Sequence, residues 1–166
     1  MKVAKIVRHK ILNNASIFDE TIRVYNEALS FITEVIDQEV SDTNAYLTKE
    51  MTNVVERLIH ATKSNPNPKY TEFNQRFYKF PTYFRRAAIA TAFGKVKSYR
   101  SLLENWETEK QDALENGRKF NKQRPTKQFT HKEFPVLYKG NMFKRTSDTT
   151  AFIKVFVKND WVWVDV

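Results

Sequence analysis

The chain has 166 residues, enough for one ordinary domain with a buried core, and its 28 Lys and Arg against 19 Asp and Glu give a net charge of +9. It has no cysteine, which excludes disulfides, cysteine-based metal sites and thiol nucleophiles. The histidines at 9, 60 and 131 are too far apart in sequence to form a local metal motif. A charged N-terminus and the lack of a long apolar run predict a soluble, cytoplasmic protein without a membrane span.

The positive charge is concentrated in two blocks. Residues 64–102 carry a net charge of +7 and residues 118–145 carry +8, whereas residues 13–63 carry −5 and residues 103–117 carry −4. This segregation favours a polyanionic partner, bound by a charged face that forms on folding. The alternative is that both basic blocks are ordinary solvated surface.

The first elements expected along the chain are one strand and two helices. Residues 3–12 are rich in β-branched side chains and predict a strand. Apolar residues then repeat at helical spacing in two runs, 18–36 and 47–61, separated by a short break at 41–42. The short connection predicts an antiparallel helical pair.

An aromatic segment follows the proline-rich break at 64–68. Seven rings lie within residues 70–84, and those at helical spacing are best explained by a buried core. The remaining rings are candidates for base stacking, which stabilises a complex by roughly 1 to 3 kcal/mol per base.

A single long helix is expected between Pro81-Thr82 and Asn116-Gly117. Its apolar stripe starts at Phe84, and the opposite face should carry Phe93 among basic residues, including Arg86. Thirty or so helical residues would span about 50 Å, more than the roughly 40 Å of a compact domain of this size. The helix therefore either breaks at Gly94 or projects from the domain.

The remainder of the chain predicts a basic loop and then strands. Residues 118–132 lack an apolar period, and the β signals beyond residue 134 include a hairpin turn at 158–160. We expect an α+β fold: a small antiparallel sheet or barrel formed by N- and C-terminal strands, with a helical insertion containing a helical pair and one long helix. The β part would comprise 1–12 and 133–166, and the insertion 13–132.

The sequence shows no complete reaction centre. The three glycines are isolated at 94, 117 and 140, so there is no glycine-rich phosphate loop. Asp165 ends a strand, as the metal-binding aspartates of nucleases often do, but no second or third ligand accompanies it. We therefore expect no catalytic residue, no metal and no cofactor.

Several stretches resemble the TnpB (OrfB) family of transposon-encoded, RNA-guided DNA endonucleases, which are related to type V CRISPR effectors. The similarity covers roughly residues 75–166, and residues 1–63 only in layout. The stretches that carry it are Phe80-Pro81-Thr82-Tyr83, Arg85-Arg86-Ala87-Ala88-Ile89-Ala90, Phe93-Gly94-Lys95-Val96-Lys97-Ser98-Tyr99, Asn105-Trp106 and Pro135-Val136-Leu137-Tyr138-Lys139-Gly140-Asn141-Met142.

The resemblance implies wedge and recognition parts that hold guide RNA and target duplex. It implies contacts with the nucleic-acid backbone for five basic residues, namely Arg85, Arg86, Lys95, Lys97 and Arg100. The full set of predicted nucleic-acid-binding residues adds Tyr78, Lys79, Phe93, Lys139, Lys144 and Arg145.

The motifs of the TnpB nuclease domain do not occur in this chain. We therefore expect a noncatalytic, nucleic-acid-binding portion of a TnpB-like protein. Its expected partners are structured RNA or duplex DNA, and the missing nuclease domain. Two alternatives stay open. The first is a protein-interaction scaffold that docks a partner through the acidic helical pair at 13–63, and the second is a complete enzyme of another type.

Overall fold

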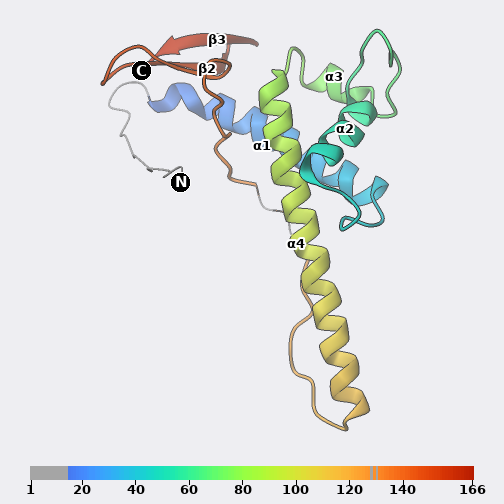
Figure 1. Cartoon of the computed structure of the whole chain (residues 1–166). Coiled ribbons are helices and arrows are strands. Elements are labelled where there is room, and N and C mark those ends of the chain that lie inside the picture. The colour runs from blue at the N-terminus through green and yellow to red at the C-terminus, as the bar shows by residue number, and fades with distance from the viewer. Residues whose placement is uncertain (1–14, 128, 130) are drawn as a thin grey trace, which may run out of the picture.

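The computed structural model describes residues 15–127, 129 and 131–166, and it confirms the α+β class. The predicted strand at 3–12 lies outside these residues. The elements follow one another along the chain as drawn in Figure 1. They are a short 3-10 helix, η1 (Ala15–Phe18), then α1 (Asp19–Glu39), α2 (Thr48–Ile59), α3 (Glu72–Arg76), α4 (Thr82–Glu115), β1 (Phe143–Arg145), β2 (Ala151–Val157) and β3 (Asp160–Asp165).

The core lies where α1 and α2 pack against the first half of α4. The apolar period predicted for α1 is buried except at Ile22, which is half-buried, and the stripe that starts at Phe84 is buried as far as Val96 and half-buried beyond it. On α2 the buried residues are Met51, Val55 and Ile59, whereas Leu47 precedes the helix and is exposed. The most extensive contact of α1 is with α4, so the long helix is the element around which the others are arranged.

The aromatic segment contributes mainly to this core. Phe73, Phe77, Phe80 and Phe84 are buried, and neighbouring rings in the series lie 4.9 to 6.2 Å apart in tilted or edge-on contacts. Tyr78 differs from them, because 66% of its surface is exposed. The core interpretation of the rings at helical spacing is therefore confirmed.

The helix α4 is continuous through Gly94 and projects from the rest of the molecule (Figure 1). Its 34 residues give a length of about 51 Å. It ends in a Schellman motif: Gly117 has φ +62°, its N–H donates to the Leu114 carbonyl, and the Arg118 N–H donates to the Ala113 carbonyl. The predicted entry and exit of the long helix are both confirmed.

The basic loop after α4 lies along the projecting half of that helix. Arg118 pairs with Asp112, Lys122 with Glu109, and the Trp106 indole N–H donates to the Lys122 carbonyl at 2.9 Å. Residues 118–127 form neither helix nor strand, as predicted. The acids of α4 hold this loop in place, so Arg118, Lys122 and Arg124 already have intramolecular partners.

The three described strands form an open antiparallel sheet in the order β1-β2-β3, not a barrel. Lys158 and Asn159 both have positive φ, at 50° and 63°, as a two-residue type I′ turn requires. One face of the sheet buries Ile153 and Val155 against Phe18. On the other face Trp161 contacts the rings of Phe80 and Phe84 in the helical core. The sheet therefore packs against the helical part on both faces, in a small separate cluster around Phe18 and at the main core through Trp161.

None of the helices within the described ranges has a stretch both long and apolar enough to cross a lipid bilayer.

Candidate nucleic-acid interface

The first two cations of the predicted α4 face are held by α2. The Arg85 side chain is almost fully buried, and its Nη2 lies 3.3 Å from Oε1 of Glu56. Arg86 places its Nε 3.4 Å from the same carboxylate oxygen. Burial lowers the pKa of Arg85, and the Glu56 carboxylate opposes that shift. These two residues thus join α4 to α2. Arg85 is too buried to meet a phosphate, whereas Arg86 is half exposed and uses only its Nε in this contact.

Arg100 holds the end of α1. It donates to the carbonyls of Asp37 and Ser41, both at 3.0 Å, and to that of Val40, and it lies 3.4 Å from Oδ1 of Asp37. The last carbonyls of a helix have no partner within the helix, and a guanidinium can satisfy several of them. Arg100 therefore serves as a tertiary cap. Lys95 likewise pairs with Glu133 at 2.8 Å.

The expectation that Phe93 faces outward is wrong. Its ring is only 3% exposed and belongs to the main core, and the Lys97 ammonium lies 5.8 Å from the ring centroid. A helical wheel with one apolar stripe assumes one buried side. The first half of α4 is packed on more than one side, because both α1 and α2 contact it.

Opposite charge blocks pair with each other across the fold. Four acids of the segment 13–63 bind cations from the segment 64–127. These pairs are Glu27 with Arg76, Asp37 with Arg100 and Lys127, Glu39 with Lys69, and Glu56 with Arg85 and Arg86. Much of the charge that the sequence offers to a partner, acidic or basic, is thus neutralised within the chain.

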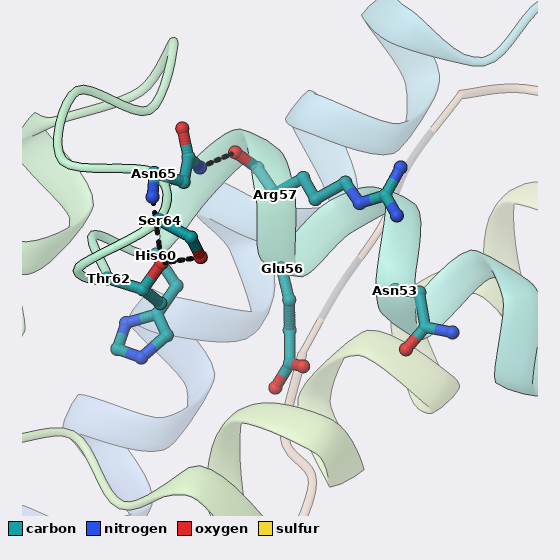
Figure 2. A pocket seen from close by; sticks show the side chains of 7 residues that line it. All are labelled: Asn53, Glu56, Arg57, His60, Thr62, Ser64 and Asn65. Carbon is teal, nitrogen blue, oxygen red and sulfur yellow. Dashed lines mark hydrogen bonds between the residues drawn. The ribbon is translucent and has the colours of Figure 1, made fainter.

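A surface hollow of about 680 Å³ lies beside the end of α2, but its side chains do not converge (Figure 2). Glu56 points toward α4, and Arg57 points away from the turn at 62–65. His60 faces Asn74, with Nδ1 3.4 Å from its Oδ1. Within the described residues no group of three or more His, Asp or Glu side chains could hold a metal ion. Asp165, the acid considered as a metal ligand in the sequence, is exposed at the end of β3.

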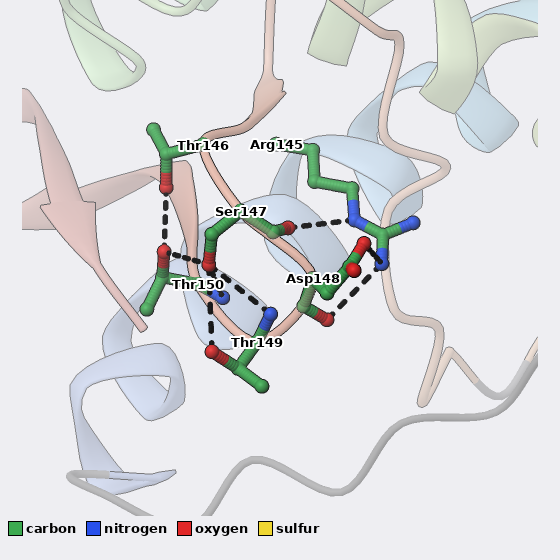
Figure 3. Close-up of polar contacts among 6 residues, drawn as sticks. All are labelled: Arg145, Thr146, Ser147, Asp148, Thr149 and Thr150. Atoms are coloured by element: carbon green, nitrogen blue, oxygen red, sulfur yellow. Dashed lines mark hydrogen bonds and ion pairs between the residues drawn. The ribbon is translucent and has the colours of Figure 1, made fainter.

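Arg145 is engaged in its own turn (Figure 3). Its guanidinium donates to the Ser147 carbonyl at 2.8 Å and to the carbonyl and carboxylate of Asp148 at 3.0 and 3.1 Å. The Ser147 hydroxyl accepts the N–H groups of Thr149 and Thr150. Arg145 is therefore a structural part of the β1–β2 connection.

A different surface gathers rings and lysines without carboxylate partners on the strands. Lys154 pairs in register with Trp163, and Lys144 with Phe152, so all four side chains share one face of the sheet. The ammonium groups of Lys144 and Lys154 lie 4.5 and 5.8 Å from the Trp163 ring centroid. Neither lysine takes part in an ion pair with the described part of the chain.

Tyr78 and Lys79 stand next to this face, at the hairpin end of β3. Lys79 lies 5.4 Å from the Tyr78 ring centroid and 3.5 Å from Oδ1 of Asp160. The Trp161 N–H donates to the Asp160 carboxylate at 2.9 Å and lowers its pKa, and Lys79 and Lys154 lower it further. We call the six residues of this face and its edge the sheet surface: Tyr78, Lys79, Lys144, Phe152, Lys154 and Trp163. Of its three lysines, Lys79 is paired with Asp160, whereas Lys144 and Lys154 have no ion pair with the described residues.

Three of the predicted residues, Tyr78, Lys79 and Lys144, fall in the sheet surface, while Lys139 is exposed in the turn that leads to β1. The sequence reasoning missed Phe152, Lys154 and Trp163. A signal for them was present, because a two-residue turn at Lys158-Asn159 fixes the register that pairs Lys154 with Trp163.

Comparison with known families gives one result. The model of the Aq_aa04 family matches residues 5–157, which is most of the chain. The chain belongs to the Aq_aa04 family. No curated protein and no solved structure matches it.

The Aq_aa04 match ends at the last residue of β2, so it includes the whole helical part and every residue of the sheet surface except Trp163. The family assignment says nothing of the TnpB resemblance, which stays a prediction.

Proposed function

We propose that this Aq_aa04 protein is a noncatalytic nucleic-acid-binding module that contacts its ligand through the sheet surface. The observation that carries the proposal is the placement of Lys144 and Lys154 over Trp163 without a carboxylate partner. A base can stack on such a ring, and two ammonium groups beside it can each neutralise a flanking phosphate. If the TnpB resemblance holds, the ligand is a guide RNA or its target DNA in the cytoplasm.

The α4 cations are a poorer choice for the primary contact. Arg85 and Arg100 would have to leave a carboxylate or helix carbonyls before they could bind a phosphate, and Lys95 is paired with Glu133. Breaking a buried ion pair costs about 3 to 5 kcal/mol, which exceeds the gain from one exposed phosphate contact. Lys144 and Lys154 give up only their position over a ring, worth about 0.5 to 1 kcal/mol at an exposed site.

The test is a salt series of binding measurements by fluorescence anisotropy, with labelled single-stranded RNA, single-stranded DNA and duplex DNA. The variant is Lys144→Glu with Lys154→Glu. The matched control is Arg57→Glu with Lys63→Glu, which makes the same change in net charge at exposed residues elsewhere. We expect the sheet variant to lower the slope of log K against log salt by about 1.4 to 1.8, from two lost phosphate contacts.

The control should bind within about threefold of wild type at the same salt, because exposed charges beyond the Debye length are largely screened. Equal slopes for wild type and the sheet variant would contradict the proposal. Equal losses in the sheet variant and the control would mean that only net charge matters.

A further inference from the structure

A pocket of about 480 Å³ lies between α1, the turn from α3 to α4, and the β2–β3 hairpin. It is more enclosed than the hollow beside α2. Its lining combines rings, the guanidiniums of Arg23 and Arg76, the amides of Gln75 and Asn159, and the carboxylate of Glu27, which pairs with both guanidiniums. Pockets that hold small planar ligands have this size and this mixture of apolar surface with a few polar groups.

The rings form an accessible apolar wall. Phe77 and Phe80 are buried beneath the pocket, whereas Phe156 is partly exposed and Tyr78 is largely exposed. Phe156 is fixed by its contact with Trp161, whose ring centroid lies 5.2 Å away, and by its N–H bond to the Thr21 hydroxyl at 2.8 Å. A flat group that enters between Tyr78 and Phe156 therefore meets rigid aromatic surface.

Arg76 supplies a cation with most of its donors unused. Its guanidinium lies 5.2 Å from the Phe77 ring centroid, and its contact with Glu27 is long, at 3.5 Å. Arg23 shares Glu27, at 2.7 Å, and also approaches Glu20, so Arg23 is the more fully neutralised of the two. A guanidinium has five N–H donors and binds phosphate oxygens in pairs, and the Arg76 side chain is 56% exposed.

Two amides at the pocket have no side-chain partner in the described residues. Gln75 lies at the end of α3 next to Arg76, and Asn159 occupies the apex of the type I′ turn with φ 63°. An amide offers both a donor and an acceptor, which matches the polar edge of a nucleobase. Rings, an available guanidinium and two amides together fit a base with its phosphate.

We propose that this pocket binds one unstacked nucleobase of a single-stranded nucleic acid, with the base against Tyr78 and Phe156 and its phosphate on Arg76. The inference rests on the proposed function and adds to it a preference for single strands, since a paired base cannot leave its duplex without a cost in stacking. Tyr78 belongs to both the pocket and the sheet surface, which places the two next to each other.

The first experiment is photocrosslinking with a single-stranded oligonucleotide that carries 5-iodouracil, followed by mapping of the linked peptide. We expect crosslinks at Tyr78 or Phe156 as well as at Trp163. Crosslinks confined to Trp163 would overturn the pocket and leave the sheet surface in place. Absence of both binding and crosslinking would overturn the proposed function itself.

The second experiment measures affinity for single strands and for duplex of the same sequence. The variant is Gln75→Ala with Arg76→Ala and Asn159→Gly, because glycine keeps the positive φ that the turn requires. The control is Arg57→Ala, which removes the same single charge at an exposed residue elsewhere. We expect the variant to lose about 10- to 150-fold in single-strand affinity, the equivalent of the charged hydrogen bonds between Arg76 and the phosphate, and to lose less for duplex. A variant that keeps its fold by circular dichroism and its wild-type affinity would refute the pocket.

Discussion

The basic residues of α4 and those of the sheet have opposite environments although both look like surface charge in the sequence. On α4, Arg85 is buried against Glu56, and Arg100 caps the last turn of α1. On the sheet, Lys144 and Lys154 lie over the ring of Trp163 and have no carboxylate partner in the described residues. Arg85 and Arg100 therefore stabilise the fold, whereas Lys144 and Lys154 are available to a ligand.

The difference shows what charge segregation along a chain can mean. A basic block that faces an acidic block in the same fold neutralises it, as α4 and the helices of 13–63 do. The basic loop and the acidic end of α4 repeat the same arrangement in the projecting arm. Counting charge by segment identifies the blocks, but whether a block binds itself or a partner depends on tertiary contacts.

The largest effect on the α4 side of this comparison should come from Glu56→Ala. Removing the carboxylate leaves the buried Arg85 guanidinium without its counter-ion, and we expect the free energy of unfolding to fall by about 3 kcal/mol. Urea titration followed by circular dichroism measures the change. Glu34→Ala, at an exposed position of α1, is the control and should change stability by less than about 0.5 kcal/mol. Loss of nucleic-acid binding in Glu56→Ala while it remains folded would contradict the division between the two regions.

Arg100→Met should have the next largest effect. It removes the donors for three carbonyls at the end of α1, and hydrogen bonds to a charged group contribute about 1.5 to 3 kcal/mol. Arg100→Lys should recover only part of this loss, because an ammonium cannot reproduce the planar fork. Full recovery with lysine would mean that charge alone, and not the pattern of donors, holds α1 in place.

Elements whose signals are local could be predicted from the sequence. Pro81 and Gly117 mark the two ends of α4, and Lys158-Asn159 marks the hairpin, because each of these residues acts on its own backbone. The buried helix faces followed from the 3.6-residue period.

Features that depend on distant contacts could not be predicted. The Asn26 amide accepts the Glu133 N–H at 2.8 Å and donates to the Glu133 carbonyl at 3.0 Å, and so fixes an extended segment 107 residues away. No periodic pattern in the sequence predicts this pair of hydrogen bonds. The same reason explains the error at Phe93, because a second neighbour of α4 cannot be read from the period of α4 itself.

On the sheet side, Trp163→Leu separates stacking from charge. We expect single-strand affinity to fall by about 5- to 20-fold, about 1 to 1.8 kcal/mol, because a stacking ring is lost while both lysines remain. The slope of log K against log salt should stay at its wild-type value, in contrast to the lysine variant. Anisotropy titrations at several salt concentrations measure both quantities. A changed slope would mean that Trp163 acts by positioning Lys144 and Lys154 and not by stacking.

The smallest effect should be a pH dependence of stability at His131, which lies between α1 and α4. Its Nε2 is 3.4 Å from the Thr33 hydroxyl. That hydroxyl donates its proton to the Leu29 carbonyl, so it accepts the imidazole proton from Nε2, and the buried Nδ1 has no hydrogen-bond partner among the described residues. Protonation would place a charge in this site, and burial, together with the nearby Lys95 ammonium, lowers the pKa of His131 below 6.5, against the opposing effect of Glu133.

Because the unfolded chain takes up the proton at higher pH than the folded chain, this histidine's contribution to stability is complete above about pH 6.5 and is lost progressively as the pH falls below that value. The slope should be well under 1.4 kcal/mol per pH unit, since the site is only partly buried. The measurement is the unfolding free energy of wild type and of His131→Gln between about pH 5.5 and 7.5. This pH range isolates the effect of His131, because the carboxylates with lowered pKa, Glu39 and Asp160, titrate well below it. The difference between the two proteins should shrink or reverse toward pH 5.5, whereas nucleic-acid binding by the sheet should change equally in both. A difference that does not vary with pH would mean that His131 has the same pKa in the folded and unfolded chains, and a stability that falls as the pH rises would mean that the folded protein holds a charged imidazolium beside Lys95.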